Sequence, residues 1–541
     1  MDVGFNRWTC SSSVRERHTC GFAHPRIEVI KHRQRLGAIR AHAMLAPMRR
    51  ALVLLAVVAA CGKRAAVDPG PDVMVVGEST RVRLEDPVPA TTPWFDGREV
   101  TLVGARGETL GIQVLQRVPS IVKLELPGVE VRAFAVEAFR VSRPSTGLFG
   151  GSRGKGRYAD GLVEQPAPAT SPAYFEIAIE GEPGVRTGEL VVGARRVPVK
   201  LTVEKLVLPP LPRSVWAYED PRELAWHAGA TGERPRVDTP SAAERACIAM
   251  FREHGVMLAP DLPLASWDAY KELLDGFPHV PVIISTDPAK AGDDVRGWIE
   301  ATRGTGQVPF SIPIDEPRTD EARANVKALA QAVRAAGGGP TTFRYAVTDA
   351  ARAAYGDLID LYISWNAAHL AGDTHARWTY NGAPPYAGAV VLDALTPGTR
   401  TWGWIGWRWK IPVWYVWDAL YWHDRHNRKG APLPGRALDP AIDPVSFDDG
   451  EDRGNLDGVL ALPGCRRTLR LAALRRGLVD RQLLELAATC APDETAKLAA
   501  ELVPRALGDA TGKQPSWPTD EAAWELARRR LLQLASCGSP P

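Results

Sequence analysis

The sequence predicts a multidomain protein in which an N-terminal β-sandwich precedes a (β/α)8 TIM-like barrel, with extra helices at the C-terminus. Residues 73–205 contain short runs of alternating apolar and polar residues between Gly- and Pro-rich turns, which is typical of an all-β sandwich. Residues 214–490 alternate apolar strand-like runs with helical stretches, which is typical of a (β/α)8 barrel. The Pro-rich segment "LVLPPLPR" at residues 206–213 is the expected linker.

The N-terminal segment is expected to lie outside both domains. Residues 1–60 are interpreted as a mis-assigned extension followed by a lipoprotein signal peptide, because "MRR" precedes ten apolar residues, a run too short to span a bilayer. The run ends in "VAAC", and small residues before a Cys resemble a bacterial lipobox. We therefore predict that Cys61 is lipidated, that residues 61–72 form a tether, and that the protein is anchored in a bacterial cell envelope, at the outer membrane or the periplasmic face. A genuine basic N-terminal arm is the alternative.

The composition argues against a nucleic-acid-binding protein. The chain is 45% apolar and 24% charged, as expected of a globular protein. Residues 1–60 hold ten of the 66 basic and three of the 63 acidic residues, so 56 and 60 remain and the net charge becomes −4. No basic stripe with interleaved aromatic residues is present. Seventeen Trp against twelve Phe favour a sugar-binding cleft, because indole rings stack on pyranose faces, although packing explains most single Trp residues.

The barrel region predicts eight strands and several helices. The strands are expected at residues 214–219, 256–260, 280–285, 309–314, 342–347, 359–364, 388–393 and 413–418. The helices are expected at residues 241–254, 320–336 and 397–409. A helix at residues 469–488 is expected to pack outside the barrel, and another at residues 519–535 belongs to a C-terminal extension of residues 491–541.

The stretch "FSIPIDEPRTDEARANVKAL" places two adjacent carboxyl groups, Asp315 and Glu316, at the end of the fourth expected strand. Barrel enzymes place their chemistry at the C-terminal ends of strands. A carboxyl pair there can supply an acid/base and an orienting group, with the Glu pKa raised by its neighbour and by partial burial. The alternative is an ordinary pair, one member bound to an Arg and the other solvated.

Aromatic and polar residues at other strand ends are expected to line a substrate cleft. The predicted substrate-binding residues are Tyr218, Trp365, Asn366, Trp378, Tyr380, Trp417, Asp418, Tyr421 and Trp422. Four further Trp residues, at positions 402, 404, 407 and 409, lie on an expected helix and are interpreted as packing on the outer shell of the barrel.

Several stretches in this order resemble glycoside hydrolase family 123, over most of residues 75–490. "GETLGIQV" resembles the family's Gly-Glu-x-x-Gly-Phe-Gln motif, and "YADGL" is similar to its Tyr-Pro-Asp-Pro-Leu. "TWGWIGWRWKIPVWYVWDALYW" resembles its Gly-Trp-x-x-Trp helix and the strand that follows. "NLDGVLALPG" and "TLRLAALRRGLVDRQLLELA" resemble its closing segment and last helix, with departures at "LPG", "RRG" and "DRQ".

Known members of that family are β-N-acetylgalactosaminidases with a sandwich, a barrel and an Asp-Glu pair after the fourth strand. The resemblance implies that Glu316 is the general acid/base and that Asp315 orients the 2-acetamido group of the substrate. In this substrate-assisted, retaining route the sugar's carbonyl oxygen is the nucleophile, an exception to the two-carboxylate scheme. The expected substrate is a glycan with a terminal β-linked N-acetylhexosamine resembling GalNAc, and no cofactor or metal is expected.

Two other functions remain open from the sequence. One is a surface lipoprotein that binds glycans without cleaving them. The other is a conventional two-carboxylate glycosidase, in which Glu219, Asp393 or Asp418 would be the partner of Glu316.

Cysteine and histidine residues give weaker signals. Cys465 and Cys490 could form a disulfide in an exported protein, and no spacing typical of a zinc site is present. The stretch "YWHDRHNRKG" holds His423, Asp424 and His426, but a solvated loop is the more usual explanation of such a sequence.

Overall fold

The computed structural model describes residues 73–538, apart from residue 88 and residues 118–119, 165–171, 230–238, 350–351, 365–375 and 425–435. The expectations for Cys61, Trp365, Asn366 and His426 therefore lie outside the described residues.

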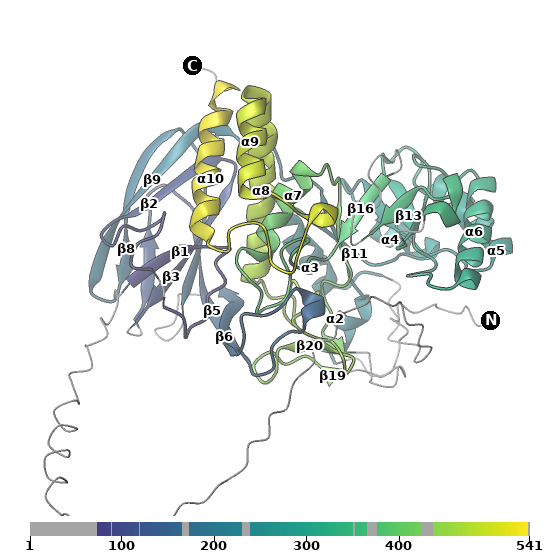
Figure 1. The fold of residues 1–541 in the computed structure, drawn as a ribbon, viewed down its shortest axis with the longest axis horizontal. Helices are drawn as coiled ribbons and strands as arrows, with labels where there is room; N and C mark the ends of the chain where they lie inside the picture. Colours follow the sequence, from purple (N-terminus) through teal and green to yellow (C-terminus); the bar gives the residue numbers. More distant parts are fainter. Residues whose placement is uncertain are drawn as a thin grey trace, which may run out of the picture. The chain divides into compact units, whose positions relative to one another are not determined.

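Nine strands in two sheets come first (Figure 1). They are β1 (Val73–Gly77), β2 (Val100–Arg106), β3 (Thr109–Gln116), β4 (Val122–Glu125), β5 (Val131–Val141), β6 (Gly156–Glu164), β7 (Ala173–Ala178), β8 (Gly184–Val192) and β9 (Arg195–Val207). The sheet orders are β1-β3-β7-β5-β6 and β2-β9-β8-β4, and every pairing is antiparallel except the parallel pair β2–β9.

The alternation that predicted these strands also predicts their buried faces. Along β9, Val197, Val199, Leu201 and Val203 are buried while the residues between them are more exposed, as the two-residue period of a strand requires. Side chains from both sheets belong to one hydrophobic cluster, in which Val199 of one sheet and Phe175 of the other take part. The sandwich arrangement of the two sheets stays a prediction.

Eight further strands form one parallel sheet, β11-β10-β17-β16-β15-β14-β13-β12. Their bounds are β10 (Val215–Tyr218), β11 (Val256–Ala259), β12 (His279–Pro281), β13 (Val308–Ser311), β14 (Arg344–Val347), β15 (Leu361–Ile363), β16 (Ala376–Tyr380) and β17 (Trp414–Val416). A parallel bridge between Leu262 and Val282, just after β11 and β12, joins the two edges. The sheet is therefore a nearly closed barrel, compatible with the predicted TIM-like domain.

Helices follow most of these strands. They are α2 (Pro221–His227), α3 (Ala242–Glu253), α4 (Trp267–Tyr270), α5 (Pro288–Ala301), α6 (Asp320–Ala335) and α7 (Thr401–Arg408). Short 3-10 turns are present as well: η1 (Gly147–Phe149), η2 (Leu264–Ser266), η3 (Arg352–Ala354), η4 (Gly356–Leu358) and η6 (Gly398–Arg400). A capping box between Ser241 and Glu244 begins α3, and the Thr319 side chain caps α6 by accepting from the backbone of Ala322.

The strand predicted at residues 388–393 is wrong, because the seventh barrel strand is β16 at Ala376–Tyr380. Residues 388–393 are buried without belonging to a strand. A Cβ on Gly388 would lie 1.9 Å from the carbonyl oxygen of Gly398, so this segment is pressed against the turn that leads into α7. A short apolar run can form a buried strand or another buried segment, so its composition could not distinguish the two. Helix α5 was not among the helices expected from the sequence.

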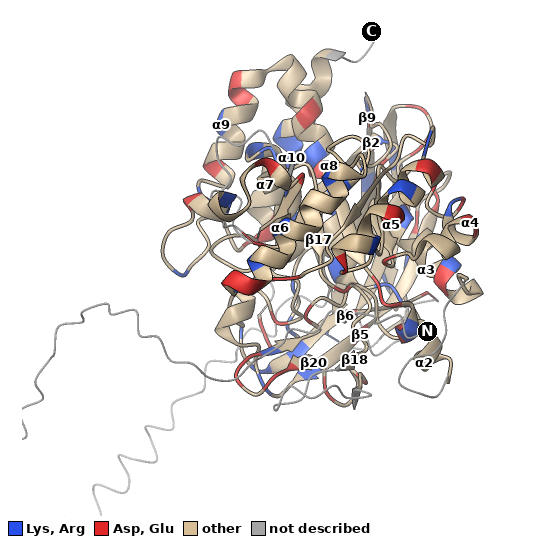
Figure 2. Ribbon diagram, turned by 90° about the vertical axis from the view of Figure 1, so that its right-hand side faces the viewer, with Lys and Arg blue, Asp and Glu red and all other residues tan. Residues whose placement is uncertain are grey.

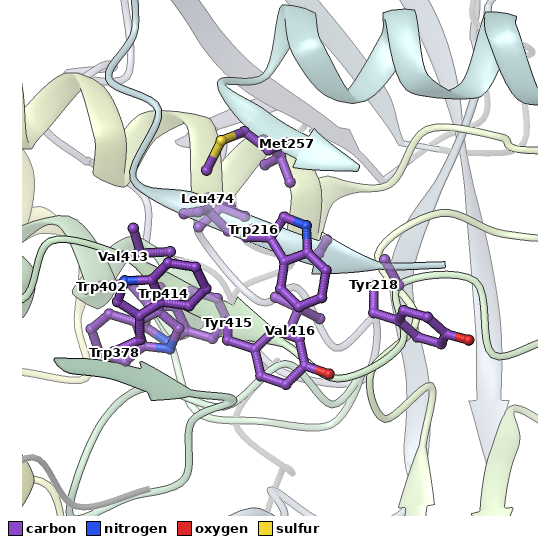
Figure 3. Close-up of a cluster of buried hydrophobic side chains, with 14 of the residues drawn as sticks. Trp216, Tyr218, Met257, Trp378, Trp402, Val413, Trp414, Tyr415, Val416 and Leu474 are labelled. Carbon is purple, nitrogen blue, oxygen red and sulfur yellow. The ribbon is translucent and has the colours of Figure 1, made fainter. Parts of the chain in front are cut away.

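Aromatic side chains fill the barrel interior (Figure 3). Trp216 stacks on Tyr415 with ring centroids 4.6 Å apart, and Trp378 meets Phe310 edge-on at 5.0 Å. On α7, Trp402 stacks on Trp414 of β17 at 4.9 Å. Trp402 therefore has the packing role that was expected for the Trp residues of this helix.

The C-terminal helices are α8 (Leu469–Cys490), α9 (Pro492–Leu502) and α10 (Glu521–Leu534), which lie side by side in Figure 1. Short elements around them are β18 (His423–Asp424) paired with β19 (Arg436–Ala437), β20 (Val445–Asp448) paired with β21 (Arg453–Asn455), η7 (Leu507–Asp509) and η8 (Ala535–Gly538). Helix α8 packs against α7 through Gly403, where a Cβ would lie 1.7 Å from the carbonyl oxygen of Gly477.

Buried ion pairs join these helices to the first sheets. On α8, Arg476 binds Glu78 at 2.7 Å and Glu108 at 3.1 Å, and Arg475 binds Glu176 at 2.9 Å. The "RRG" departure from the family pattern thus supplies two of the cations of this interface. The stretch that contains Glu108, "GETLGIQV", serves the contact between sheets and helices rather than the chemistry.

The disulfide suggested between Cys465 and Cys490 is wrong, because the disulfides are Cys247–Cys465 and Cys490–Cys537. Helix α8 separates Cys465 from Cys490, and its 22 residues span about 33 Å at about 1.5 Å per residue. The bond from Cys247 connects α3 to the turn before α8. The bond from Cys490 connects the end of α8 to η8 in the C-terminal extension.

Candidate active site

The carboxyl pair lies just beyond the fourth barrel strand in chain order. Strand β13 ends at Ser311, Asp315 and Glu316 follow in the next turn, and Thr319 caps α6. Pro317 lies between the pair and the Thr319 cap. It lacks a backbone N–H and disfavours a helical conformation for Glu316, so α6 begins only after the pair. The pair is therefore at the carboxyl end of the barrel, which is where barrel enzymes carry their functional residues.

One hydroxyl group contacts both members of the pair. Thr348, the residue after β14, donates a hydrogen bond to Oδ1 of Asp315 at 2.6 Å and accepts one from the backbone N–H of Glu316 at 2.7 Å. Strands β13 and β14 are paired in parallel, so their carboxyl ends are neighbours. The pair is thus held from the adjacent strand as well as by its own turn.

Asp315 has a raised pKa, of about 6. Loss of hydration by burial is the main cause, the hydrogen bond from Thr348 opposes it, and the charge of Glu316 adds to it. Asp315 is exposed when the whole residue is considered, but protein atoms surround its carboxyl group closely. A carboxyl group with this pKa changes its charge in the mildly acidic range.

Glu316 is half-buried and is the less exposed member of the pair. Its side chain is 35% exposed and is ion-paired with Arg318, which is 78% exposed. Its backbone has a φ of 41°, in the left-handed region that a Glu residue seldom adopts. Exposed ion pairs contribute little stability, typically about 0–1 kcal/mol, so a ligand can displace Arg318 easily.

Tyr415 of β17 presents a buried hydroxyl group on the same side of the barrel. This hydroxyl has no hydrogen-bond partner among the described residues, and in Figure 3 it points to the same side as the hydroxyl of Tyr218, the last residue of β10. Burial, with the negative charges of Asp261 and Asp315, raises its pKa well above the usual value. The hydroxyl is therefore neutral and keeps its proton, and it is buried in this structure.

Two of the alternative carboxyl partners are unsuited to act as a nucleophile. Burial, with the charges of Glu244 and Asp418, raises the pKa of Glu219 well above its usual value, which favours the neutral form of this completely buried side chain. The buried carboxylate of Asp393 is held by Ser145, Ser152 and Asn455.

The predicted aromatic residues fall into two groups. Trp378, Tyr421 and Trp422 are at most 1% exposed, so none of them offers an open ring face for a sugar in this structure. Tyr380 and Trp417 are half-buried and more accessible.

The polar candidate Asp418 is 1% exposed and Tyr218 is 8% exposed, so both lie largely beneath the surface. Asp418 accepts a hydrogen bond from the backbone of Leu420 at 3.1 Å. Trp417 donates a side-chain hydrogen bond to Asp457, whose pKa burial raises to about 7. Trp417 and Asp418, the two residues after β17, are therefore both packed and hydrogen-bonded.

Sequence reasoning missed Thr348, Tyr415 and Asp261. Thr348 and Asp261 each follow an expected strand directly, so their position at a strand end was available as a signal. Tyr415 lies inside an expected strand, and only the structure shows that its hydroxyl lacks a partner.

The described residues show no other site of comparable character. A surface hollow of about 1040 Å³ between α4 and α5 is lined by Trp267 and Glu300 among others, but by none of the residues above. No group of three or more His, Cys, Asp or Glu residues in the described part of the chain is arranged to hold a metal ion, and His423 is instead paired with Glu223. Within the same part of the chain, no helix is both long and apolar enough to span a membrane.

Comparison with solved structures shows which fold this site is built on. A family 123 glycoside hydrolase from Clostridium perfringens, studied for glycolipid glycan hydrolysis, covers 85% of this chain and 97% of its own, with a TM-score of 0.55 at 11% identity. An FMN-binding β-glucuronidase from Facaelibacterium prausnitzii covers 76% of this chain and 61% of its own at 10% identity, and a GH10 xylanase from termite gut covers 71% and 100% at 9% identity. Their TM-scores of 0.24 and 0.26 are too low to support an argument.

Scans against protein-family models and curated proteins found no match. The likeness to the family 123 enzyme is therefore one of fold.

Proposed function

We propose that this protein is an exported glycoside hydrolase that removes a terminal β-linked N-acetylhexosamine, of the GalNAc type, by substrate-assisted catalysis with retention. The observation that carries the proposal is the Asp315-Glu316 pair at the carboxyl end of the fourth barrel strand, on a fold similar to that of a family 123 glycoside hydrolase. Fold likeness at 11% identity supports the class, and the carboxyl pair supports the chemistry.

In this mechanism the protonated carboxyl of Glu316 gives its proton to the glycosidic oxygen while the bond from that oxygen to C1 breaks. The carbonyl oxygen of the 2-acetamido group attacks C1 and forms a cyclic oxazolinium ion. The ionised carboxylate of Asp315 accepts a hydrogen bond from the acetamide N–H and stabilises the positive charge. Water then attacks C1, Glu316 takes its proton, and the ring opens with the original configuration restored.

The surroundings of the pair favour this route over the two-carboxylate alternative. A conventional retaining enzyme needs a second ionised carboxylate, about 5–5.5 Å from the acid, as nucleophile. Glu219 is completely buried with a raised pKa, and Asp393 is engaged by three side chains. The neutral Tyr415 hydroxyl has no hydrogen-bond partner among the described residues, so a sugar oxygen that reached it could accept its hydrogen bond.

Export is supported by the two disulfides, because such bonds persist in oxidising compartments and are rare in the cytosol. Together with the lipobox-like "VAAC", they support a lipid anchor at Cys61 in the cell envelope. Cys61→Ser should move the protein from the membrane fraction to the soluble fraction of a bacterial host. An unchanged distribution would contradict the anchor.

The enzymatic proposal is tested with three 4-nitrophenyl β-glycosides: the N-acetylgalactosaminide, the N-acetylglucosaminide and the galactoside, which lacks the acetamide. The first should be hydrolysed and the galactoside should not, because it has no internal nucleophile. A thiazoline mimic of the intermediate should inhibit the wild type and bind Asp315→Asn less tightly. Equal hydrolysis of the galactoside would contradict substrate assistance, and glycan binding without any hydrolysis would favour a non-catalytic binding protein.

A further inference from the structure

Thr348 occupies an unusual position with respect to the carboxyl pair. A backbone N–H can only donate, so the Thr348 oxygen is the acceptor in its contact with Glu316, at 2.7 Å. The single hydroxyl proton is therefore free to be donated to Oδ1 of Asp315, at 2.6 Å. A hydrogen bond donated to a carboxyl oxygen stabilises the ionised form of that group.

The second contact of Thr348 acts on the backbone. The N–H of Glu316 belongs to the peptide unit that joins Asp315 to Glu316, so fixing this unit fixes the directions in which both side chains leave the chain. Glu316 has a φ of 41°, and a conformation of this kind in a residue other than Gly costs about 1–3 kcal/mol unless its surroundings hold it. The Thr348 hydroxyl is the side-chain contact that holds the N–H at this turn.

The strongest charge effects on Asp315 from the described residues come from its own segment. On its own segment, the charge of Glu316 disfavours its ionised form and the charge of Arg318 favours it. From β17, Tyr415 interacts with it but stays neutral. Thr348, from β14, is thus the neighbouring-strand group that opposes the effect of burial on Asp315.

We infer that Thr348 is the positioning residue of the carboxyl pair, which keeps Asp315 ionised and aimed at the acetamide group while it sets the turn that presents Glu316. This inference rests on the proposed function for its catalytic meaning. The Thr348 hydroxyl contacts both members of the pair, so its effect would be exerted through these two neighbours.

The test compares Thr348→Val, which keeps the shape but loses the hydroxyl, with Thr348→Ser, which keeps the hydroxyl. Both are made in the full-length protein and assayed on the 4-nitrophenyl N-acetylgalactosaminide from pH 4.5 to 8.5. The Val variant should lose about tenfold in kcat at neutral pH, and the acidic limb of its kcat/KM profile should move up by about 1–2 pH units, as loss of one hydrogen bond to a charged group predicts. The Ser variant should restore both quantities.

Thr342→Val is the matched control, because Thr342 precedes the same strand at its opposite end and its hydroxyl bonds the backbone of Gly337 at 2.9 Å. This variant should leave the pH profile unchanged. A Val variant at position 348 with the profile of the wild type, or a Ser variant as impaired as the Val variant, would overturn the inference.

A second measurement separates this inference from the proposed function. Titration of 13C-labelled Asp carboxyl groups by NMR, with Asp315→Asn for assignment, gives the pKa of Asp315 without any turnover. This pKa should rise in Thr348→Val, and an unchanged value would overturn the role of Thr348 even in an active enzyme. Lack of hydrolysis by the wild type, with the shift present, would contradict the proposed function alone.

Discussion

The guanidinium group of Arg470 on α8 donates hydrogen bonds to both carboxylate oxygens of Asp160 on β6, at 3.0 to 3.1 Å, and both side chains are completely buried. Removing one member leaves a buried charge without compensation, which typically costs about 3–5 kcal/mol. We expect Asp160→Asn to lower the free energy of unfolding by about this amount, as measured by urea denaturation.

The matched control for this prediction is an exposed ion pair. Arg196 is 64% exposed and binds Glu189 on the neighbouring strand β8. Arg196→Met should change the free energy of unfolding by about 1 kcal/mol or less, because solvent screens such pairs. Similar losses in the two variants would contradict the importance of the buried pair.

Glu316→Gln should lower turnover in a way that depends on the leaving group. The amide keeps the shape of the side chain but cannot donate the proton that the departing oxygen needs, and general acid catalysis contributes roughly 10²–10⁴-fold. The loss should be large for a natural glycan and smaller for a nitrophenyl glycoside, whose leaving group needs little protonation. Steady-state kinetics on both substrates check this, and an equal loss on the two would argue against Glu316 as the acid.

The pH dependence of kcat/KM should have an acidic limb near pH 6. The pKa of Asp315 is raised to about 6, and only its ionised form carries the negative charge that would stabilise the positively charged intermediate, so activity should decrease as the pH falls through this value. The limb should be absent in Asp315→Asn. Asp457, whose pKa is raised to about 7, is another carboxyl group near the site and accepts a hydrogen bond from Trp417. Asp457→Asn should keep the limb, and its loss there would assign the limb to Asp457.

Tyr415→Phe should reduce activity without reducing stability. The hydroxyl lacks a partner in the described protein, so its removal should leave the melting temperature unchanged or higher, whereas loss of one hydrogen bond to the substrate should lower kcat/KM by about tenfold. Tyr174→Phe is the control, because that hydroxyl lies 3.0 Å from Glu78 in the sheets. It should lower the melting temperature and leave kinetics unchanged. A destabilised Tyr415→Phe with normal kinetics would show that the hydroxyl serves the fold.

The sequence predicted strands and helices correctly where the spacing of apolar residues follows the period of a strand or a helix. Seven of the eight barrel strands lie where the apolar runs predicted them, and the helix expected at residues 320–336 is α6. The failure at residues 388–393 has a physical cause, since that run is buried by a close contact between Gly388 and Gly398 rather than by strand pairing. Only β16, a less apolar segment, has the neighbours needed to complete the barrel.

The candidate site was less accessible from the sequence because its contacts join separate strands. Position alone marked Asp315 and Glu316, but nothing in the order of residues shows that Thr348 reaches both. The aromatic content was a weaker guide, because Trp378 and Trp422 serve the packed interior. Burial of an aromatic ring depends on what covers it, and that is a property of the assembled barrel.

The ion pairs of the C-terminal helix have a consequence for biosynthesis. Arg528 on α10 binds Glu108, which the ribosome makes 420 residues earlier, and Glu521 binds Ser79 across 442 residues. The first sheets therefore emerge with acidic groups whose cationic and hydrogen-bonding partners do not yet exist. Contacts over such long separations form late and slowly. A chain that stops before α10 leaves Glu108 with Arg476 but without Arg528, and so with only part of its charge compensation.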